Sequence, residues 1–403
     1  MNTLTAFYDL PKEWEVVRLL DITHIFDGTH QTPQYTHHGV AFFSVENIAN
    51  NKPNKFISQQ DYLIATSKNK PEYNDILLTR IGAIGISKVV SWTYPFSIYV
   101  TLAVIKQSKY FNSYYLHYFI QSSFFQKELK DNSLLQAIPC KINMDKLKKC
   151  KVILPPLNEQ SAIANILSGL DRYLCALDAL ILKKEGVKKA LSFELLSQKK
   201  RLKGFNQAWQ RVRLGDIAEI KRGASPRPIE NPKWFCTNSN VGWVRISDIS
   251  KNSRFLYKTA QKLSKKGIEK SRLVKQNSLI MSMCATIGKP IITKIDTCIH
   301  DGFVVFENPK IDLNYLYYFL CYIEKEWLES GQQGSQVNLN GDLIKNKEVF
   351  YPKDLNEQIA IANILSALDN EITSLKNKKR QFENIKKALN HDLMSAKIRV
   401  LEK

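Results

Sequence analysis

The chain has 403 residues, 44% of them hydrophobic, and a net charge of +20 from 58 Lys and Arg against 38 Asp and Glu. This length predicts more than one domain, the hydrophobic content is ordinary for folded domains, and the positive charge favours a polyanion such as DNA as partner. The seven cysteines are odd in number and show no C-x-x-C spacing, which argues against a disulfide framework or a zinc site.

The opening residues, MNTLTAFYDLPKEWEVV, lack the basic and apolar regions of a signal peptide. No run of about 18 uncharged apolar residues occurs, so we expect no membrane-spanning helix. The histidines and cysteines have no metal-ligand spacing. We therefore expect a cytoplasmic protein with reduced thiols and no bound metal.

The first predicted domain, residues 1–155, alternates short apolar runs with turn residues. Val40–Val45, Ile76–Thr79 and Ile98–Ile105 are rich in Val, Ile, Phe and Tyr and are bounded by Gly, Asn, Pro and Ser. Such runs predict strands. The segment YLHYFI at Tyr115–Ile120 predicts a helix whose aromatic side chains pack in the core. This domain should therefore be a mixed α/β unit.

Polar residues in three loops of this domain are candidates for contacts with DNA bases. Arg and Lys suit guanine, Asn and Gln suit adenine, and Thr suits a thymine methyl group or a phosphate. The third loop also holds glycines, which we interpret mainly as turn residues with positive φ. The candidates are Thr29, His30, Gln31, Thr32 and His37 in the first loop, Asn47 in the second, and Arg80 and Ser87 in the third.

Residues 156–205 predict one long helix. It follows two prolines, with Asn158 as the expected N-cap, and is expected to run to about Lys203, before Gly204. Its apolar residues recur at a spacing near 3.5, which is typical of a coiled-coil seam, although Lys184 interrupts the pattern. The seam residues are Ile163, Ile166, Leu170, Tyr173, Leu177, Leu180, Val187 and Leu191.

Residues 206–354 repeat the first domain. The motif W-x-x-x-R-L-x-D-I at Trp14–Ile22 returns at Trp209–Ile217, and YLHYFI returns as YLYYFL at Tyr315–Leu320. The runs Leu279–Met283 and Phe303–Phe306 predict strands. Six such matches in the same order indicate a duplicated unit with divergent loops.

The loops of the second copy carry different polar residues from those of the first. Its DNA-contact candidates are Lys221, Arg222, Ser225, Arg227, Asp248, Thr286 and Lys289. An amide-rich tract adds Gln333, Gln336 and Asn338, for which a solvated loop is an equally good interpretation. The two copies therefore predict two unlike recognition surfaces.

Residues 355–403 predict a second long helix. The segment LNEQIAIANILSALD at 355–369 matches LNEQSAIANILSGLD at 157–171 at 13 of 15 positions. Its seam is interrupted at Glu371 and Lys378. The seam residues are Ile361, Ile364, Leu368, Leu375, Phe382, Ile385 and Leu389.

The repeat predicts an α+β protein with a pseudo-twofold internal repeat. Two similar mixed α/β domains are expected to be separated by two long antiparallel coiled-coil helices. A helix of about 40 residues is about 60 Å long at 1.5 Å per residue, which makes the pair a spacer rod.

No catalytic motif appears in the sequence. The P-loop pattern and the G-x-G-x-x-G pattern are missing, and ILPP at 153–156 lacks the Asn or Asp that an amino-methyltransferase has before Pro-Pro. We therefore expect a non-catalytic protein. Two alternatives stay open, namely a DNA-acting enzyme with a scattered site and a duplicated protein–protein scaffold that reads no DNA sequence.

The duplicated W-x-x-x-R-L-x-D-I openings, E-Q-x-x-I-A-x-I-L helix starts and K-K-A-L helix ends resemble the specificity (S) subunits of type I restriction–modification systems, from about Pro11 to Lys403. The resemblance implies two target recognition domains that read an asymmetric, bipartite site on double-stranded DNA. It also implies helices that dock two methyltransferase (M) subunits, to which two restriction (R) subunits can be added. S-adenosylmethionine, ATP and magnesium would belong to those partners, and this chain would hold no cofactor.

The resemblance further implies that the two helix starts contact the methyltransferase. The residues concerned are Asn158, Glu159, Gln160, Asn356, Glu357 and Gln358.

Overall fold

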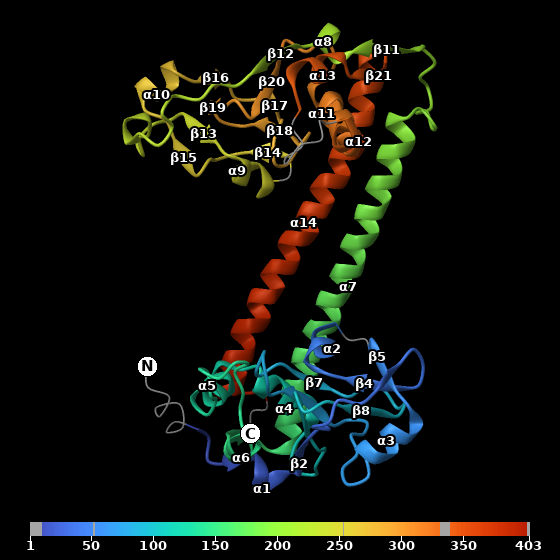
Figure 1. Ribbon diagram of the computed structural model, residues 1–403, viewed down its shortest axis with the longest axis vertical. Helices are drawn as coiled ribbons and strands as arrows, with labels where there is room; N and C mark the ends of the chain where they lie inside the picture. The colour runs from blue at the N-terminus through green and yellow to red at the C-terminus, as the bar shows by residue number, and fades with distance from the viewer. Residues whose placement is uncertain (1–9, 51–52, 253, 331–338, 401–403) are drawn as a thin grey trace. The chain divides into compact units, whose positions relative to one another are not determined.

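The computed structural model describes residues 10–50, 53–252, 254–330 and 339–400, so the candidates Gln333, Gln336 and Asn338 lie outside the described residues. The chain forms two compact units (Figure 1). Unit 1 comprises Met1–Ala179 and Asn377–Lys403, and unit 2 comprises Leu180–Lys376. Each unit thus contains one of the two predicted α/β domains together with parts of both long helices.

The domain of unit 1 contains two four-stranded sheets and one short strand pair. In the first sheet, β2 (Ile25–Asp27), β9 (Leu102–Ile105), β6 (Ile76–Thr79) and β7 (Ser87–Val89) are antiparallel neighbours. The second sheet has the order β3 (Tyr35–Thr36), β5 (Lys55–Ile57), β4 (Val40–Phe43), β8 (Phe96–Ile98), with β4 and β8 parallel. The pair consists of β1 (Glu15–Arg18) and β10 (Lys151–Leu154).

Short helices surround these sheets. They are α1 (Leu19–Ile22), α2 (Val45–Asn50), α3 (Gln59–Ala65), α4 (Ser113–Ile120), α5 (Ser123–Asp131) and α6 (Met144–Lys149). All residues of β4, β6 and β9 are buried, because these strands have apolar side chains on both faces. The α4 aromatics Tyr115, Tyr118 and Phe119 pack in one core with residues of β6 and β9, as predicted.

The domain of unit 2 repeats this architecture. Its strand pair is β11 (Trp209–Arg213) with β21 (Glu348–Pro352). One sheet has the order β12 (Glu219–Arg222), β20 (Phe303–Glu307), β17 (Leu279–Ser282), β18 (Pro290–Thr293), β14 (Phe255–Leu256). The other has the order β15 (Gln261–Lys262), β13 (Gly242–Val244), β19 (Thr297–Ile299), β16 (Arg272–Val274).

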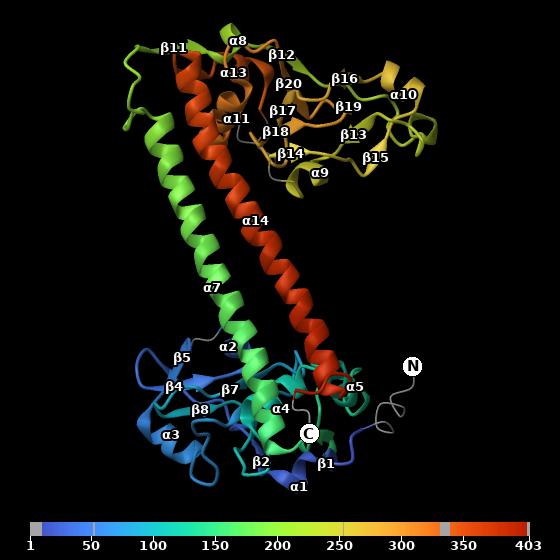
Figure 2. The ribbon, with the colours of Figure 1, turned by 180° about the vertical axis from the view of Figure 1, so that it is seen from behind.

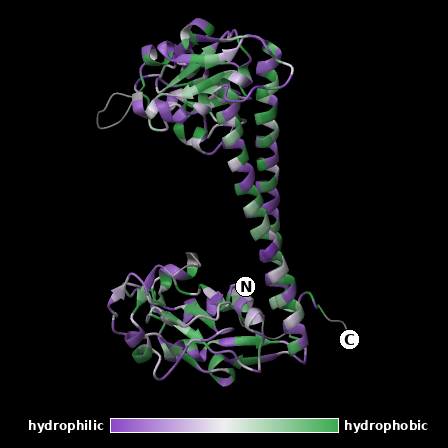
Figure 3. Cartoon of the chain, turned by 90° about the vertical axis from the view of Figure 1, so that its right-hand side faces the viewer, coloured by the Kyte–Doolittle hydropathy of each residue, from purple (hydrophilic) through white to green (hydrophobic). Residues whose placement is uncertain are grey.

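The helical segments of unit 2 follow the same order. They are α8 (Leu214–Ile217), the 3-10 helix η2 (Pro232–Trp234), α9 (Ile246–Ser250), α10 (Lys265–Glu269), α11 (Leu313–Tyr322), α12 (Glu324–Ser330) and α13 (Gly341–Asn346). In both domains the strands are largely hydrophobic and the connecting loops are richer in hydrophilic residues (Figure 3). The predicted duplication and mixed fold are thus confirmed.

The two long helices are α7 (Leu157–Leu196) and α14 (Leu355–Met394) (Figures 1 and 2). Helix α7 ends before Lys203, the predicted end, because Leu195 and Leu196 turn into the core of unit 2 and Gln198 adopts a φ of 59°. Asn158 is not the N-cap, since it lies inside the helix that Leu157 begins. None of the helices within the described residues is long and apolar enough to span a membrane.

The helices pair antiparallel inside each unit. In unit 1 the rings of Tyr173 and Phe382 lie 4.7 Å apart. In unit 2 the ion pair between Lys184 and Glu371 has a length of 2.8 Å. Lys184 and Glu371 interrupt the apolar pattern of the predicted seam. The structure gives the reason, because the two side chains form an ion pair between α7 and α14. Lys378 likewise lies over the Tyr173 ring, at 5.6 Å.

The predicted seam is partly wrong. Four of its residues are exposed, namely Ile166, Leu180, Val187 and Ile385. The residues that contact the partner helix therefore do not keep the strict spacing of a coiled-coil seam. Ile163 belongs to the domain core of unit 1, so the start of α7 is part of that domain.

Candidate nucleic-acid interface

The first candidate loop of unit 1 follows β2 and carries exposed polar side chains. Gly28 is required at its start, because a Cβ there would lie 2.1 Å from the Ile98 carbonyl oxygen. The Thr32 hydroxyl lies 3.0 Å from the Tyr99 hydroxyl, and the Thr29 hydroxyl donates to the Gln31 carbonyl at 3.1 Å. The exposed candidates of this loop are His30, Gln31, Thr32 and His37, while Thr29 is partly buried.

Arg80 supports this loop from inside the domain. Its side chain is 8% exposed, and Nη1 donates to Asp27 Oδ2 at 3.1 Å and to the Val100 carbonyl at 2.9 Å. Burial lowers the pKa of the guanidinium, and Asp27 opposes that change. Asp27 also accepts a hydrogen bond from His30 at 3.1 Å if that ring nitrogen is protonated. We therefore revise the expected role of Arg80 from base reading to holding the loop.

Asn47 and Asp248 match between the halves because both cap a helix. Asn47 is 2% exposed, and its Oδ1 accepts from the Ser44 amide at 2.9 Å at the start of α2. Asp248 is 7% exposed, and its Oδ2 accepts from the Arg245 amide at 2.9 Å at the start of α9. Both residues are buried, so their expected contact with bases is replaced by a structural role.

The glycine hairpin is also mainly structural. Gly85 and Gly288 have φ values of 93° and 73°, as the turn interpretation predicts. Ser87 is buried, and its hydroxyl lies 2.9 Å from His117 Nδ1. Burial lowers the pKa of His117 to about 4, which leaves the ring neutral near pH 7. The remaining hairpin candidates, Thr286 and Lys289, are partly buried.

In unit 2, three predicted loop residues converge on Asp301. The Ser225 hydroxyl donates to Oδ1 at 2.6 Å and Arg227 Nη2 donates to Oδ2 at 3.2 Å, while Arg222 Nε donates to the Asp301 carbonyl at 2.7 Å. The hydrogen bond from Ser225 lowers the pKa of Asp301, which keeps the carboxylate charged. Lys221 stands apart, because its ammonium pairs with Glu307 at 2.5 Å.

Sequence reasoning missed Asp301. It lies in the turn between β19 and β20, where the first half has Val100 at the corresponding position. Because the halves differ there, the internal repeat carried no signal for it. An acidic residue in a turn of a basic chain was the available signal.

The two E-Q pairs, expected to contact a partner, instead fasten each helix start to its own unit. Glu159 is 2% exposed and accepts from Arg399 Nε at 2.7 Å, from Arg399 Nη2 at 2.9 Å and from the Trp14 indole at 3.1 Å. Glu357 is fully buried and accepts from Arg201 Nε at 3.0 Å and from Nη2 at 2.9 Å. We name the first arrangement the Arg399 clamp and the second the Arg201 clamp.

The neighbouring glutamines are also internal. Gln160 Oε1 accepts from the Asn112 amide at 2.8 Å, and Gln358 Oε1 accepts from the Asp312 amide at 2.7 Å. The expected partner contacts of the E-Q pairs are corrected to structural roles, since buried atoms with satisfied hydrogen bonds offer no docking surface. The exposed candidates at the two helix starts are Asn158 and Asn356, next to exposed Leu157 and Leu355.

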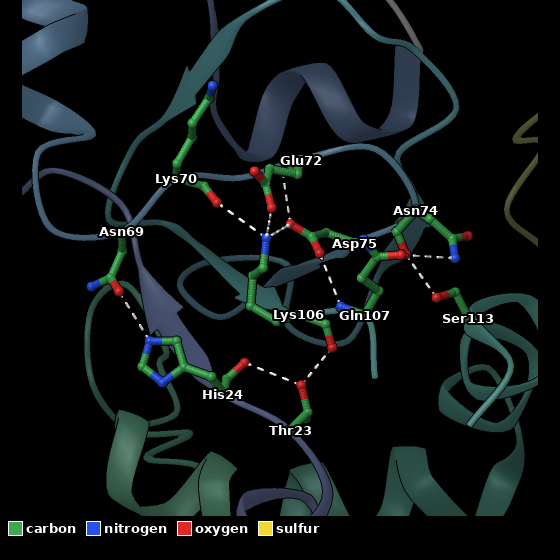
Figure 4. Close-up of polar contacts among 10 residues, drawn as sticks. All are labelled: Thr23, His24, Asn69, Lys70, Glu72, Asn74, Asp75, Lys106, Gln107 and Ser113. Atoms are coloured by element: carbon green, nitrogen blue, oxygen red, sulfur yellow. Dashed lines mark hydrogen bonds and ion pairs between the residues drawn. The ribbon is translucent and has the colours of Figure 1, made fainter. Parts of the chain in front are cut away.

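A partly buried charge cluster in unit 1 is likewise structural (Figure 4). Lys106 Nζ donates to Asp75 at 2.8 Å and to Glu72 at 2.7 Å, and Asp75 is fully buried. Burial acts to lower the pKa of Lys106, but these hydrogen bonds outweigh it and raise the pKa. Asp75 also accepts from the Gln107 amide at 2.9 Å. The cluster ties the end of β9 to the loop before β6.

Side chains that could ligate a metal ion are scattered over the part of the chain that the structure describes. No group of three or more His, Cys, Asp or Glu side chains there is placed to hold a metal ion. The exposed polar residues of the two loops and the Asp301 cluster are suited to hydrogen bonding with an anionic or base-bearing ligand.

Known proteins resemble this chain along nearly its whole length. Residues 11–185 and 206–384 each match the family described as type I restriction modification DNA specificity domain. The type I restriction enzyme MjaVIII specificity subunit of Methanocaldococcus jannaschii is 26% identical, over 97% of this chain and 94% of that protein. The putative MjaX specificity subunit of the same organism is 27% identical, over 98% and 96%. The crystal structure of the type I restriction-modification S subunit from M. genitalium has a TM-score of 0.61, 16% identity and 96% coverage of both chains, and shows the same fold.

Proposed function

We propose, from the premise that the chain belongs to the type I restriction modification DNA specificity family, that it reads a bipartite, asymmetric target on double-stranded DNA. Each recognition domain reads one half of the target. The chain itself performs no chemistry, and methylation is carried out by bound partner subunits.

The observation that carries this proposal is the contrast between the two recognition domains. The framework is the same in both, including the glycine that opens the first loop at Gly28 and Gly223. The exposed side chains on that framework differ, with His30 and Gln31 in unit 1 and Arg227 in unit 2. Different donors and acceptors select different bases, so an asymmetric pair of surfaces favours an asymmetric target.

The helix starts support docking of two methyltransferase subunits, one per unit. Each start presents an exposed leucine and asparagine, Leu157 with Asn158 in unit 1 and Leu355 with Asn356 in unit 2. An exposed leucine beside an asparagine offers a partner protein one apolar contact and one hydrogen-bonding group. Two restriction subunits join the complex for cleavage of unmodified DNA. S-adenosylmethionine, ATP and magnesium then serve the partner subunits.

The test is to map every methylated adenine in a genome, which is its methylome. The chain is co-expressed with its methyltransferase partner in an unmethylated host, and every modified adenine is mapped by sequencing. The expected result is one split motif with a fixed gap and two unlike halves, with no methylation when either protein is expressed alone. If both subunits form a complex and no motif is methylated, the chain acts as a scaffold and the proposal is refuted.

A further inference from the structure

A pocket of about 440 Å³ opens beside the Asp301 cluster in unit 2. It lies between the loop after β12, the start of α9 and the turn before β20. Side chains from all three segments line it, and we name it the Asp301 pocket. Its main lining residues are Ser225, Arg227, Trp243, Arg245, His300 and Asp301.

The walls of the pocket offer hydrogen-bond donors. Arg227 is 71% exposed and is held by Asp301, whose other carboxylate oxygen accepts from Ser225. Arg245, which also lines the pocket, is exposed. A guanidinium held by a carboxylate keeps its remaining N–H groups in a fixed fork, which suits paired acceptors on a planar ligand.

Two aromatic side chains, Trp243 and His300, also line the pocket. Trp243 is fully buried, and its ring lies 5.8 Å from the His300 ring. The Trp243 indole nitrogen is buried and, among the described residues, has no hydrogen-bond partner. Burial lowers the pKa of the His300 imidazole, and its Nδ1 accepts a hydrogen bond from the Gly302 amide at 2.9 Å. Two guanidinium groups against one carboxylate leave the pocket with an excess of positive charge.

Unit 1 has no counterpart to these arginines. The Thr29 amide donates to the Ile98 carbonyl at 3.1 Å, as the Ala224 amide donates to the Ile299 carbonyl at 3.0 Å, which fixes the correspondence between the loops. Counting from these pairs, Thr32 stands where unit 2 has Arg227.

The same holds for Arg245. The parallel pairing of β4 with β8 and of β13 with β19 places Ser44 where unit 2 has Arg245. Ser44 is buried and its hydroxyl donates to Asn47 at 3.1 Å. The arginine-lined pocket is therefore particular to unit 2.

We propose that the Asp301 pocket receives the major-groove edge of a guanine, with Arg227 and Arg245 donating to its O6 and N7 atoms. Guanine is the base whose major-groove edge presents two adjacent acceptors, which Arg matches with two donors. This inference deepens the proposed function and rests on it, because it names the base class that unit 2 selects. It predicts a guanine in one half of the target whose reader is absent from unit 1.

The test compares the methylome of the complex with those of the Arg227→Ala and Arg245→Ala variants. The expected result is that one G·C position, in one half of the motif, becomes degenerate while the other half is unchanged. Arg211→Ala is the matched control, because Arg211 is an exposed arginine of unit 2 outside the pocket, and it should leave the motif intact.

A binding measurement keeps the test independent of variant stability. The purified wild-type complex is titrated with target DNA in which 7-deazaguanine, which lacks the N7 acceptor, replaces the guanine at that position. We expect affinity to fall by about tenfold, within the range for a lost base contact. The variants should discriminate between the two DNAs less than the wild type.

Three outcomes would overturn the inference. One is a wild-type motif without guanine in the half that the variants affect. Another is a uniform loss of affinity with unchanged sequence preference and a weaker salt dependence, which indicates phosphate contacts. The third is an equal response to 7-deazaguanine in wild type and variants. These three outcomes concern only the guanine inference. The proposed function is tested by the wild-type complex alone, which supports it by methylating a split motif and refutes it by methylating none.

Discussion

Replacing Arg399 with alanine should destabilise unit 1 and leave unit 2 intact. The substitution removes both guanidinium bonds to Glu159, whose side chain is 3% exposed, and leaves only the Trp14 indole as donor. Breaking a buried pair costs about 3–5 kcal/mol. Because the Arg399 side chain is 30% exposed, we discount this to about 2–3 kcal/mol. For a unit of this size the midpoint of thermal unfolding should fall by about 6 °C.

Hydrogen exchange read by mass spectrometry, alongside urea denaturation, checks this prediction. Amides of β1 and α4 in unit 1 should lose protection, while those of β11 and α11 in unit 2 should not. Adding Glu159→Gln to the variant should restore about 1 kcal/mol, because the uncompensated charge is removed. Arg380→Ala is the control, since Arg380 is an exposed arginine of the same unit. A change below about 0.5 kcal/mol, or equal loss of protection in both units, would show that the clamp reasoning is wrong.

Three further predictions follow from the burial of single groups. Folding lowers the pKa of His117 from 6.5 to about 4, so the unfolded chain takes up the proton first. The stability of unit 1 should therefore fall by up to about 3 kcal/mol from pH 6.5 to 4 and stay flat above, and urea titrations of His117→Gln should lack this slope. Asp248→Ala should cost about 1–2 kcal/mol in urea denaturation, because the α9 cap is lost, and an unchanged midpoint would contradict that role. Ile163→Asp should abolish soluble expression, whereas Ile166→Asp, at a 39% exposed position, should be tolerated, and equal yields would count against the assigned core.

The duplication made the framework predictable from sequence. The strand predicted at Ile76–Thr79 has the same bounds as β6, and both aromatic helices pack as expected. A residue that is shared by the two halves is one that their common fold requires, so it is more often structural than specific to one target. Asn47 and Asp248 match because both cap a helix, and the E-Q pairs match because both lie in clamps. The strongest repeat signals therefore identified structural residues.

The recognition features were harder to predict for the same reason. Asp301 and Arg245 stand where the first half has Val100 and Ser44, so the comparison of halves did not single them out. Burial was the second obstacle, since Arg80 and Arg227 are alike in sequence terms and only the fold shows that one is enclosed and the other exposed. The Lys184–Glu371 ion pair depends on the register of two distant helices, which no local pattern encodes.

The Arg399 clamp has a consequence for the order in which the chain matures on the ribosome. Unit 2 is one continuous segment, Leu180–Lys376, and its Arg201 clamp is complete once that segment has emerged. Residues up to Ala179 of unit 1 are made before unit 2, but unit 1 also needs Asn377–Lys403, which are translated after unit 2. Unit 1 is therefore incomplete, with Glu159 lacking its contacts to Arg399, until unit 2 and the residues after it have been synthesised. A premature stop just after Lys376 would accordingly leave unit 2 complete and damage unit 1, although most of unit 1 is encoded upstream of the stop.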